Sequence, residues 1–278
     1  MISYSGGKHK QARWIRSFIP AVKTYAEIFG GAMWVYITND SPTNGSIVCN
    51  KAIYNDYNKY MYNLFTSCRN YNELYRLASQ LEPWNQQNFD KCQSTFMERS
   101  MDFNVPDLEL AVCYAYISTH VFSGMLKPKG NKMAKDDTPK YKAFIGRLQD
   151  PNIQRKFDKL ETLNLSYELA IEKLDGPDTF MYVDPPYYGT EKYYILHSFG
   201  LKDHERLADV LKSCKSKWIL SYYDFPDLTK WFPEDQYVYQ RKDYAKMTSH
   251  IATKTKGTEV LVMNYEPVSG LDIGAFWK

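Results

Sequence analysis

With 278 residues, the chain is long enough for one α/β domain with a sizeable core and a smaller inserted domain, and its net charge of +3 does not by itself mark a nucleic-acid-binding protein. Its five cysteines are odd in number, widely spaced and free of any C-x-x-C pair, which argues against a disulfide framework and a zinc site. No apolar run approaches the roughly 20 residues that span a bilayer, so we expect a cytoplasmic protein that binds neither membrane nor metal.

The N-terminus holds a glycine-containing loop, residues 3–8, followed by a helical pattern that Pro20 ends. Gly6 and Gly7 allow a ligand to approach the backbone closely, and Lys8 places a cation beside it. A Gly-Gly turn that starts a helix is the more common reason for this pattern, so the loop alone does not define a site.

Two strands are predicted next, each followed by residues suited to a ligand. Residues 24–29 form a short apolar run that leads into Gly30, where a missing side chain leaves room for a nucleotide. Residues 51–56 form a second strand that ends in Asp56, about 25 residues beyond the glycine, the offset at which a carboxylate binds ribose hydroxyls in dinucleotide folds. An Asx turn or a helix N-cap is the alternative for Asp56.

Residues 71–165 are predicted to form helices and polar loops without a buried strand, and we interpret them as an inserted domain. Residues 109–122 within them are expected to form a core helix whose His120 is packed. Lys127, Lys129 and Lys132 lie among Gly, Pro and Asn, a composition that suits a loop in contact with phosphates. A solvated charged surface is the alternative.

The sequence Asp184-Pro185-Pro186-Tyr187 follows the apolar strand predicted at residues 180–183. Prolines do not donate to a strand ladder, so the strand ends here and the carboxylate lies at the sheet edge where α/β folds bind ligands. Carboxylate and prolyl carbonyl oxygens beside an aromatic ring suit a planar group that carries an NH2. A strand end closed by a Pro-Pro turn is the alternative.

The remainder of the chain completes an α/β pattern. A capped helix is expected from Asp203, with His204 exposed in its first turn. Strands are expected at 217–224 and 259–265.

Asp-Pro-Pro-Tyr resembles the catalytic motif of amino-methyltransferases that act on nucleic acid, and the chain is similar to DNA adenine methyltransferases of the Dam type. The likeness extends to the family's other motifs in the family's order, namely the aromatic-x-Gly-Gly-Lys loop at 4–8, the cofactor motif at 27–31, Asn-Asp-x-Asn at 55–58, Ser-Tyr at 221–222 and Glu-x-Leu-x-x-Asn-Tyr at 259–265. The chain departs from the family with Tyr4 for the usual Trp, Ile28 for the usual Pro and one glycine fewer in the cofactor motif.

The resemblance implies a Rossmann-like α/β fold that binds S-adenosylmethionine, formed by residues 1–70 and 166–278, with a mainly helical DNA target-recognition domain at 71–165. It implies that the cofactor contacts are Tyr4, Lys8, Glu27, Phe29, Gly30, Asp56 and Asp184. The catalytic residues are then Asp184, Pro185, Pro186 and Tyr187, where Asp184 and the Pro185 carbonyl accept hydrogens from the 6-amino group of an adenine flipped out of double-stranded DNA, and Tyr187 stacks on it.

Other substrates of this enzyme class are cytosine, RNA and the glutamine of release factors, and a non-catalytic DNA-binding module is a further alternative. The glutamine enzymes typically have Asn in place of Asp184, and the order of motifs favours adenine in DNA. The resemblance implies a bacterial or phage-encoded protein. A monomer is the simplest expectation, although no feature of the sequence defines the oligomeric state.

Overall fold

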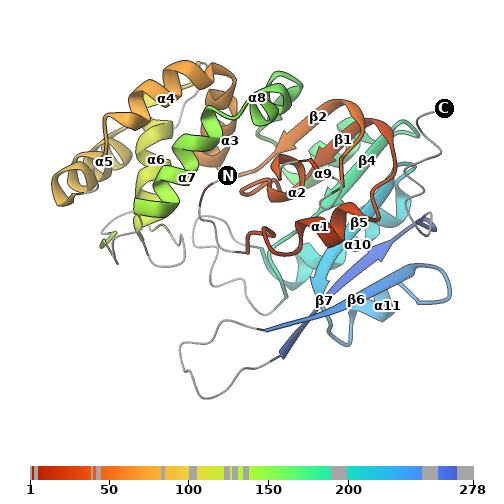
Figure 1. Ribbon diagram of the computed structural model, residues 1–278. Helices are drawn as coiled ribbons and strands as arrows, with labels where there is room; N and C mark the ends of the chain where they lie inside the picture. The colour runs from red at the N-terminus through yellow and green to blue at the C-terminus, as the bar shows by residue number, and fades with distance from the viewer. Residues whose placement is uncertain are drawn as a thin grey trace.

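The computed structural model describes residues 2, 6–38, 40–41, 45–82, 85–99, 105–121, 126, 131–133, 138–188, 199–245 and 256–267. These residues form a seven-stranded sheet in the order β3-β2-β1-β4-β5-β7-β6 (Figure 1). The strands are β1 (Val22–Glu27), β2 (Cys49–Asn55), β3 (Leu160–Leu163), β4 (Thr179–Val183), β5 (Lys217–Tyr223), β6 (Val238–Ala245) and β7 (Lys256–Met263). Strands β1 to β5 are parallel, whereas β7 runs antiparallel to β5 and β6. The predicted α/β fold is confirmed.

The sheet separates two hydrophobic cores, because successive side chains of a strand point to opposite faces. In β4, Phe180 and Tyr182 belong to one core, whereas Met181 and Val183 belong to the other. The first core is covered by α1 (Ala12–Arg16), α2 (Trp34–Ile37) and α3 (Lys59–Ser67). The second is covered by α9 (Tyr167–Leu174), α10 (Leu201–Ser213) and α11 (Leu228–Trp231).

A group of helices lies between β2 and β3 in the sequence and beside the sheet in space (Figure 1). Its elements after α3 are a 3-10 turn (Cys68–Asn70), α4 (Tyr71–Ser79), α5 (Gln86–Glu98), α6 (Leu108–His120), α7 (Thr138–Leu148) and α8 (Pro151–Asp158). Helix α6 is buried over most of its length, and the Nδ1 atom of His120 lies 2.8 Å from the Tyr116 carbonyl oxygen. The prediction of a packed core helix is confirmed. None of the described helices is long and apolar enough to cross a membrane.

Strand β3 contradicts the expectation that residues 71–165 contain no sheet strand. It pairs in parallel with β2 at the edge of the sheet, although it has only four residues and three of them are not fully buried. So short a run has too little hydrophobic periodicity to be distinguished from a loop. The sheet therefore resumes before residue 165, and the division into two domains stays a prediction.

Strand β1 is the point where the strand order changes direction, since β2 lies on one side of it and β4 on the other. Such a switch point opens a crevice at the carboxyl ends of the strands. Buried Asn55 fixes this edge: its Nδ2 donates to Ile28 O at 2.8 Å and Leu165 O at 3.2 Å, and its Oδ1 accepts from Leu165 N at 3.0 Å. One side chain thus connects the segments that follow β1, β2 and β3.

Candidate active site

A cavity of about 460 Å³ opens at this edge, within the size range of small-molecule sites. It contains most of the predicted site residues, namely Lys8, Glu27, Phe29, Gly30, Asp56, Asp184 and Pro186. It is also lined by residues that the sequence did not single out, among them Leu165, Tyr167, Phe199 and Asp203. Tyr4 lies outside the described residues.

Asp184 directly follows β4, and its carboxylate is paired with Lys8. Lys8 Nζ lies 2.8 Å from Asp184 Oδ1, and the two side chains are only 8% and 15% exposed. Burial raises the pKa of Asp184 to about 6, although Lys8 opposes this shift. The cavity therefore holds a carboxylate that gains a proton in mildly acidic solution.

Glu259, in β7, lies close to the Lys8–Asp184 pair. It was not predicted as a site residue. Its carboxylate accepts from the Tyr187 hydroxyl and, at 2.5 Å, from the Ser221 hydroxyl, and its Oε1 lies 3.7 Å from Lys8 Nζ. The available sequence signal was its place as the first residue of the family's Glu-x-Leu-x-x-Asn-Tyr motif. Its partners depend on the pairing of β7 with β5, which the sequence does not reveal.

Tyr187 is 5% exposed, with the Lys8 ammonium 4.5 Å from its ring centre and Tyr223 in edge contact at 4.3 Å. A cation over an aromatic face is an attractive arrangement. The hydroxyl of Tyr187 is held by Glu259 and Ser221, so the ring is fixed beside Asp184. Its stacking on a flipped base stays a prediction.

Glu27 is the last residue of β1, and one of its carboxylate oxygens accepts two hydrogen bonds. Oε1 accepts from the Tyr25 hydroxyl at 2.9 Å and from the Tyr36 amide at 3.0 Å. Burial raises the pKa of Glu27 to about 8, and nearby Asp184 adds to this rise. A positively charged ligand in the cavity would favour the ionised form.

The glycine turn after β1 explains how the chain tolerates its departures from the family motif. A side chain at Gly30 would place Cβ 2.3 Å from the Tyr54 ring, so only glycine fits here. The second motif glycine is replaced by Met33, which adopts a left-handed φ of 51°. This conformation is uncommon for a residue with a side chain and stores strain at the cavity wall.

Asp56 joins the glycine turn to α3. Its Oδ2 accepts from Gly31 N at 2.7 Å and its Oδ1 from Asn58 N at 2.8 Å. The second bond is the Asx-type contact that was the alternative reading. Burial raises the pKa of Asp56 to about 6, and the residue still lines the cavity. The structure therefore combines the turn with a position from which ribose binding stays a prediction.

Aromatic residues also line the cavity. Phe29 stacks on Tyr167 at 5.6 Å and meets Phe199 edge-on at 5.7 Å. The expectation that His204 is exposed was wrong: it is buried, and its Nδ1 lies 2.5 Å from the Tyr222 hydroxyl. His204 lies on the buried face of α10 with Leu207, Ala208 and Leu211, which its charged sequence neighbours concealed.

Of the predicted phosphate-binding lysines, only Lys132 falls within the described residues, and it is exposed. Lys127 and Lys129 lie outside them, so DNA contact by this segment stays a prediction. Among the residues that the structure describes, no group of three or more His, Cys, Asp or Glu side chains is arranged to hold a metal ion.

Sequence comparison gives matches along nearly the whole chain. The profile of the D12 class N6 adenine-specific DNA methyltransferases matches residues 4–248. The type II methyltransferase M.CviBI of Paramecium bursaria Chlorella virus NC1A is 20% identical over 282 residues, which cover 95% of this chain and 99% of the viral protein.

Two solved structures are also similar over most of their length, both at 10% identity. A conserved hypothetical protein from Streptococcus pyogenes covers 89% of this chain and is itself covered to 89%, with a TM-score of 0.32. An rRNA methylase from Streptococcus thermophilus covers 93% of this chain and is covered to 96%, with a TM-score of 0.33. These scores are too low to define the fold, which rests on the sheet topology.

We predict that Glu259→Gln lowers the pKa of Asp184, because the negative charge of Glu259 contributes to its raised value. Carboxyl NMR titration of both proteins measures the change. The exposed Asp224 provides the matched control, and Asp224→Asn should leave the Asp184 titration unchanged. An Asp184 pKa that is the same in Glu259→Gln and wild type would contradict the coupling.

Proposed function

Because the chain belongs to the D12 class of N6 adenine-specific DNA methyltransferases and methylates adenine at specific sites in DNA, we propose that the cavity at the carboxyl ends of β1, β2 and β4 is its active site. The observation that carries the proposal is the Asp184 carboxylate, which directly follows β4 and shares one cavity with Lys8, Glu27 and Asp56. We infer that S-adenosylmethionine binds in this cavity with its methyl group directed at Asp184.

The fold and the family imply dependence on S-adenosylmethionine, and the cavity residues fit that cofactor. The close approach of Gly30 to Tyr54 leaves backbone rather than side chain at the wall, and Asp56 offers oxygen acceptors for hydroxyl groups. Burial raises the pKa of Glu27 to about 8, so a cationic ligand in the cavity would favour its ionised form. The cofactor supplies a methyl group on a positively charged sulfur, and this charge suits Glu27 and Asp184.

Asp184 and the Pro185 carbonyl would accept the two hydrogens of the adenine 6-amino group. The lone pair of that nitrogen is delocalised into the ring, which makes the nitrogen a poor nucleophile. Hydrogen-bond acceptors on both of its hydrogens would favour a tetrahedral, nucleophilic nitrogen. Lys8 holds the Asp184 carboxylate in place and favours its ionised state. Catalysis then comes from orientation and from fixed charges, without a covalent enzyme intermediate.

An adenine inside a duplex does not reach this cavity, so double-stranded DNA must release it by base flipping. Tyr187, held by Glu259 and Ser221, would provide the ring against which the base packs. The segment with Lys127, Lys129 and Lys132 would bind phosphates of the same DNA. We further propose that the enzyme acts in the cytoplasm of a bacterial or phage-infected cell.

Transfer of a tritiated methyl group from S-adenosylmethionine to DNA tests the function, with N6-methyladenine expected as the product. Methylation-sensitive sequencing of DNA from cells that express the chain would identify the target site. Methylcytosine as the product, or label in RNA alone, would contradict the proposed substrate. Cofactor binding without any transfer would favour a non-catalytic module.

Replacement of Asp184 by alanine should lower turnover by about 10³-fold or more, because the main acceptor for the amino hydrogens is lost. The protein should remain folded, since the carboxylate lies at a strand end beside a cavity. Methyl transfer and thermal unfolding are measured on the same preparation. Asp224→Ala, at the end of the next strand and outside the cavity lining, should retain wild-type turnover.

The wild-type rate should also depend on pH. The pKa of Asp184 is raised to about 6, and its ionised form is the stronger acceptor for an amino hydrogen, so kcat/KM should increase as pH rises through about 6. Near-normal turnover of a folded Asp184→Ala protein would refute this mechanism.

We expect Asp56→Ala to weaken cofactor binding by about tenfold or more, with little effect on DNA affinity. A ribose contact is similar in the ground and transition states, so its loss should raise KM for the cofactor more than it changes kcat. Calorimetric titration measures the affinity, and unaltered cofactor binding would remove Asp56 from the site.

Simultaneous replacement of Lys127, Lys129 and Lys132 by alanine should flatten the salt dependence of DNA binding by about 0.9 in log-log slope for each lost phosphate contact. The target sequence should not change, because phosphate contacts position a protein whereas base contacts specify the site. DNA affinity over a salt series measures the slope. An unchanged slope would mean that the lysines are only a solvated surface.

A further inference from the structure

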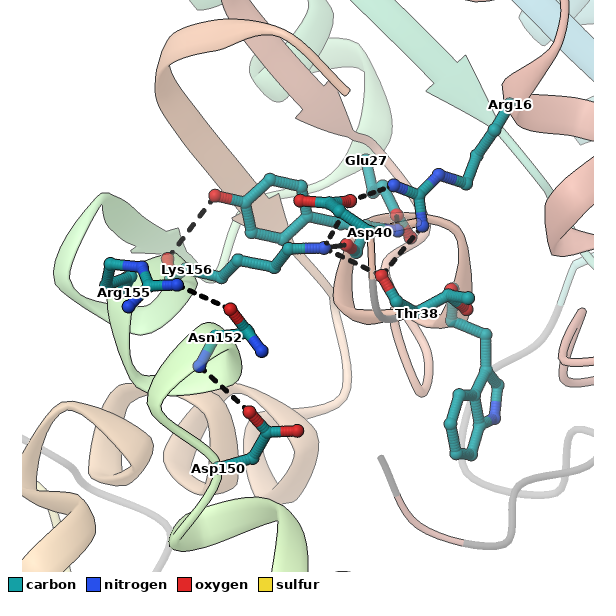
Figure 2. Close-up of polar contacts among 10 residues, drawn as sticks. Arg16, Glu27, Thr38, Asp40, Asp150, Asn152, Arg155 and Lys156 are labelled. Carbon is teal, nitrogen blue, oxygen red and sulfur yellow. Dashed lines mark hydrogen bonds and ion pairs between the residues drawn. The ribbon is translucent and has the colours of Figure 1, made fainter. Parts of the chain in front are cut away.

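Three charged side chains, Arg16, Asp40 and Lys156, meet at the carboxyl end of α2 (Figure 2). Asp40 pairs with the Arg16 guanidinium, and its Oδ1 lies 3.0 Å from Lys156 Nζ. Arg16 ends α1 and Lys156 belongs to α8, so the group connects segments far apart in the sequence. We call these three residues the α2 clamp, because both cations also bind the end of α2.

The α2 clamp holds backbone carbonyl groups as well as a carboxylate. Lys156 Nζ donates to Tyr36 O at 2.8 Å and to Thr38 O at 2.7 Å, and Arg16 Nη1 donates to Thr38 O at 2.7 Å. Cations are favourable at the carboxyl end of a helix, where carbonyl groups lack helical partners. A helix as short as Trp34–Ile37 has little stability of its own, so its position depends on these contacts.

The two cations of the clamp are buried, which is costly in free energy, whereas Asp40 is partly exposed. The Arg16 side chain is fully buried and that of Lys156 is 10% exposed. Burial lowers the pKa of Lys156, although Asp40 opposes the shift. Apolar residues of similar size commonly stabilise a protein as well as a buried ion pair does, whereas hydrogen-bonded charges fix one geometry. The clamp is thus better suited to fixing a geometry than to adding stability.

The other end of α2 forms part of the cavity. Met33, Trp34 and Val35 line it, and Met33 has the left-handed conformation described above. The Tyr36 amide, in the same helix, donates to Glu27 Oε1. Helix α2 therefore contacts the clamp through its carboxyl end. It contacts Glu27 through the Tyr36 amide, and its amino end forms part of the cavity wall.

We propose that Arg16, Asp40 and Lys156 are positioning residues for cofactor binding, which they support by holding α2 so that its Tyr36 amide and its first turn meet Glu27. This inference rests on the proposed function, because it takes the cavity to be the cofactor site. Lys156 makes the contact from α8, within the region predicted to bind DNA. The geometry of the cofactor site thus depends on a helix outside the sheet.

The test compares Lys156→Met with Arg155→Met, its neighbour in α8. Arg155 is exposed, and its side chain bonds Asn152 away from the clamp (Figure 2). Lys156→Met should weaken S-adenosylmethionine binding by about tenfold or more in calorimetry and raise KM for the cofactor, with kcat and DNA affinity changed by less than about threefold. Arg155→Met should match the wild type in each measurement.

Rescue separates positioning from general stability. Lys156→Arg retains donors for Tyr36 O and Thr38 O and should restore cofactor affinity to within about threefold of the wild type. If Lys156→Met does not fold, Asp40→Ala replaces it, because the half-exposed Asp40 is the carboxylate that pairs with both Arg16 and Lys156 and its loss should weaken cofactor binding in the same way. Cofactor affinity equal to the wild type in the folded variant would overturn the inference. Equal losses of cofactor and DNA binding, in step with a lowered Tm, would also overturn it.

A wild-type protein that binds no S-adenosylmethionine would instead contradict the proposed function. The wild-type titration is therefore performed first, and its result does not depend on the clamp.

Discussion

The ion pair between Lys8 and Asp184 is the contact on which the geometry of the active site depends. The two residues are 176 positions apart in the sequence, and their side chains are almost completely buried. Burying charges is unfavourable unless they are paired and hydrogen-bonded, so Lys8 must stay close to Asp184 and Glu259. The N-terminal loop is thereby held against the strand end that carries the reacting carboxylate.

Lys8 pairs with Asp184 and approaches Glu259, yet the pKa values of Asp184 and Glu27 are both raised. The pKa of Asp184 is raised to about 6 and that of Glu27 to about 8, mainly by burial. Both carboxyl groups line the cavity, so a cationic ligand there would favour their ionised forms.

The sequence was sufficient to predict four of the five described parallel strands and the residues that end them, because buried strands leave apolar runs and the following polar residues share one sheet edge. Strand β3 was missed because four residues carry little periodicity. Glu259 and His204 were missed as packed polar residues, since their partners depend on the pairing of β5 with β7 and on how α10 faces the sheet. The α2 clamp was unpredictable for the same reason: its members come from three separate segments and form no local pattern.

The position of Glu259 in β7 affects how the protein folds during its synthesis on the ribosome. Domains begin to fold from the N-terminus during synthesis, yet the residue that holds Tyr187 and approaches Lys8 lies in the last strand of the described chain. A nascent chain with Lys8, Asp184 and Tyr187 already made still lacks the carboxylate that fixes their arrangement. The arrangement of Lys8, Asp184 and Tyr187 is therefore completed only after β7 has been synthesised.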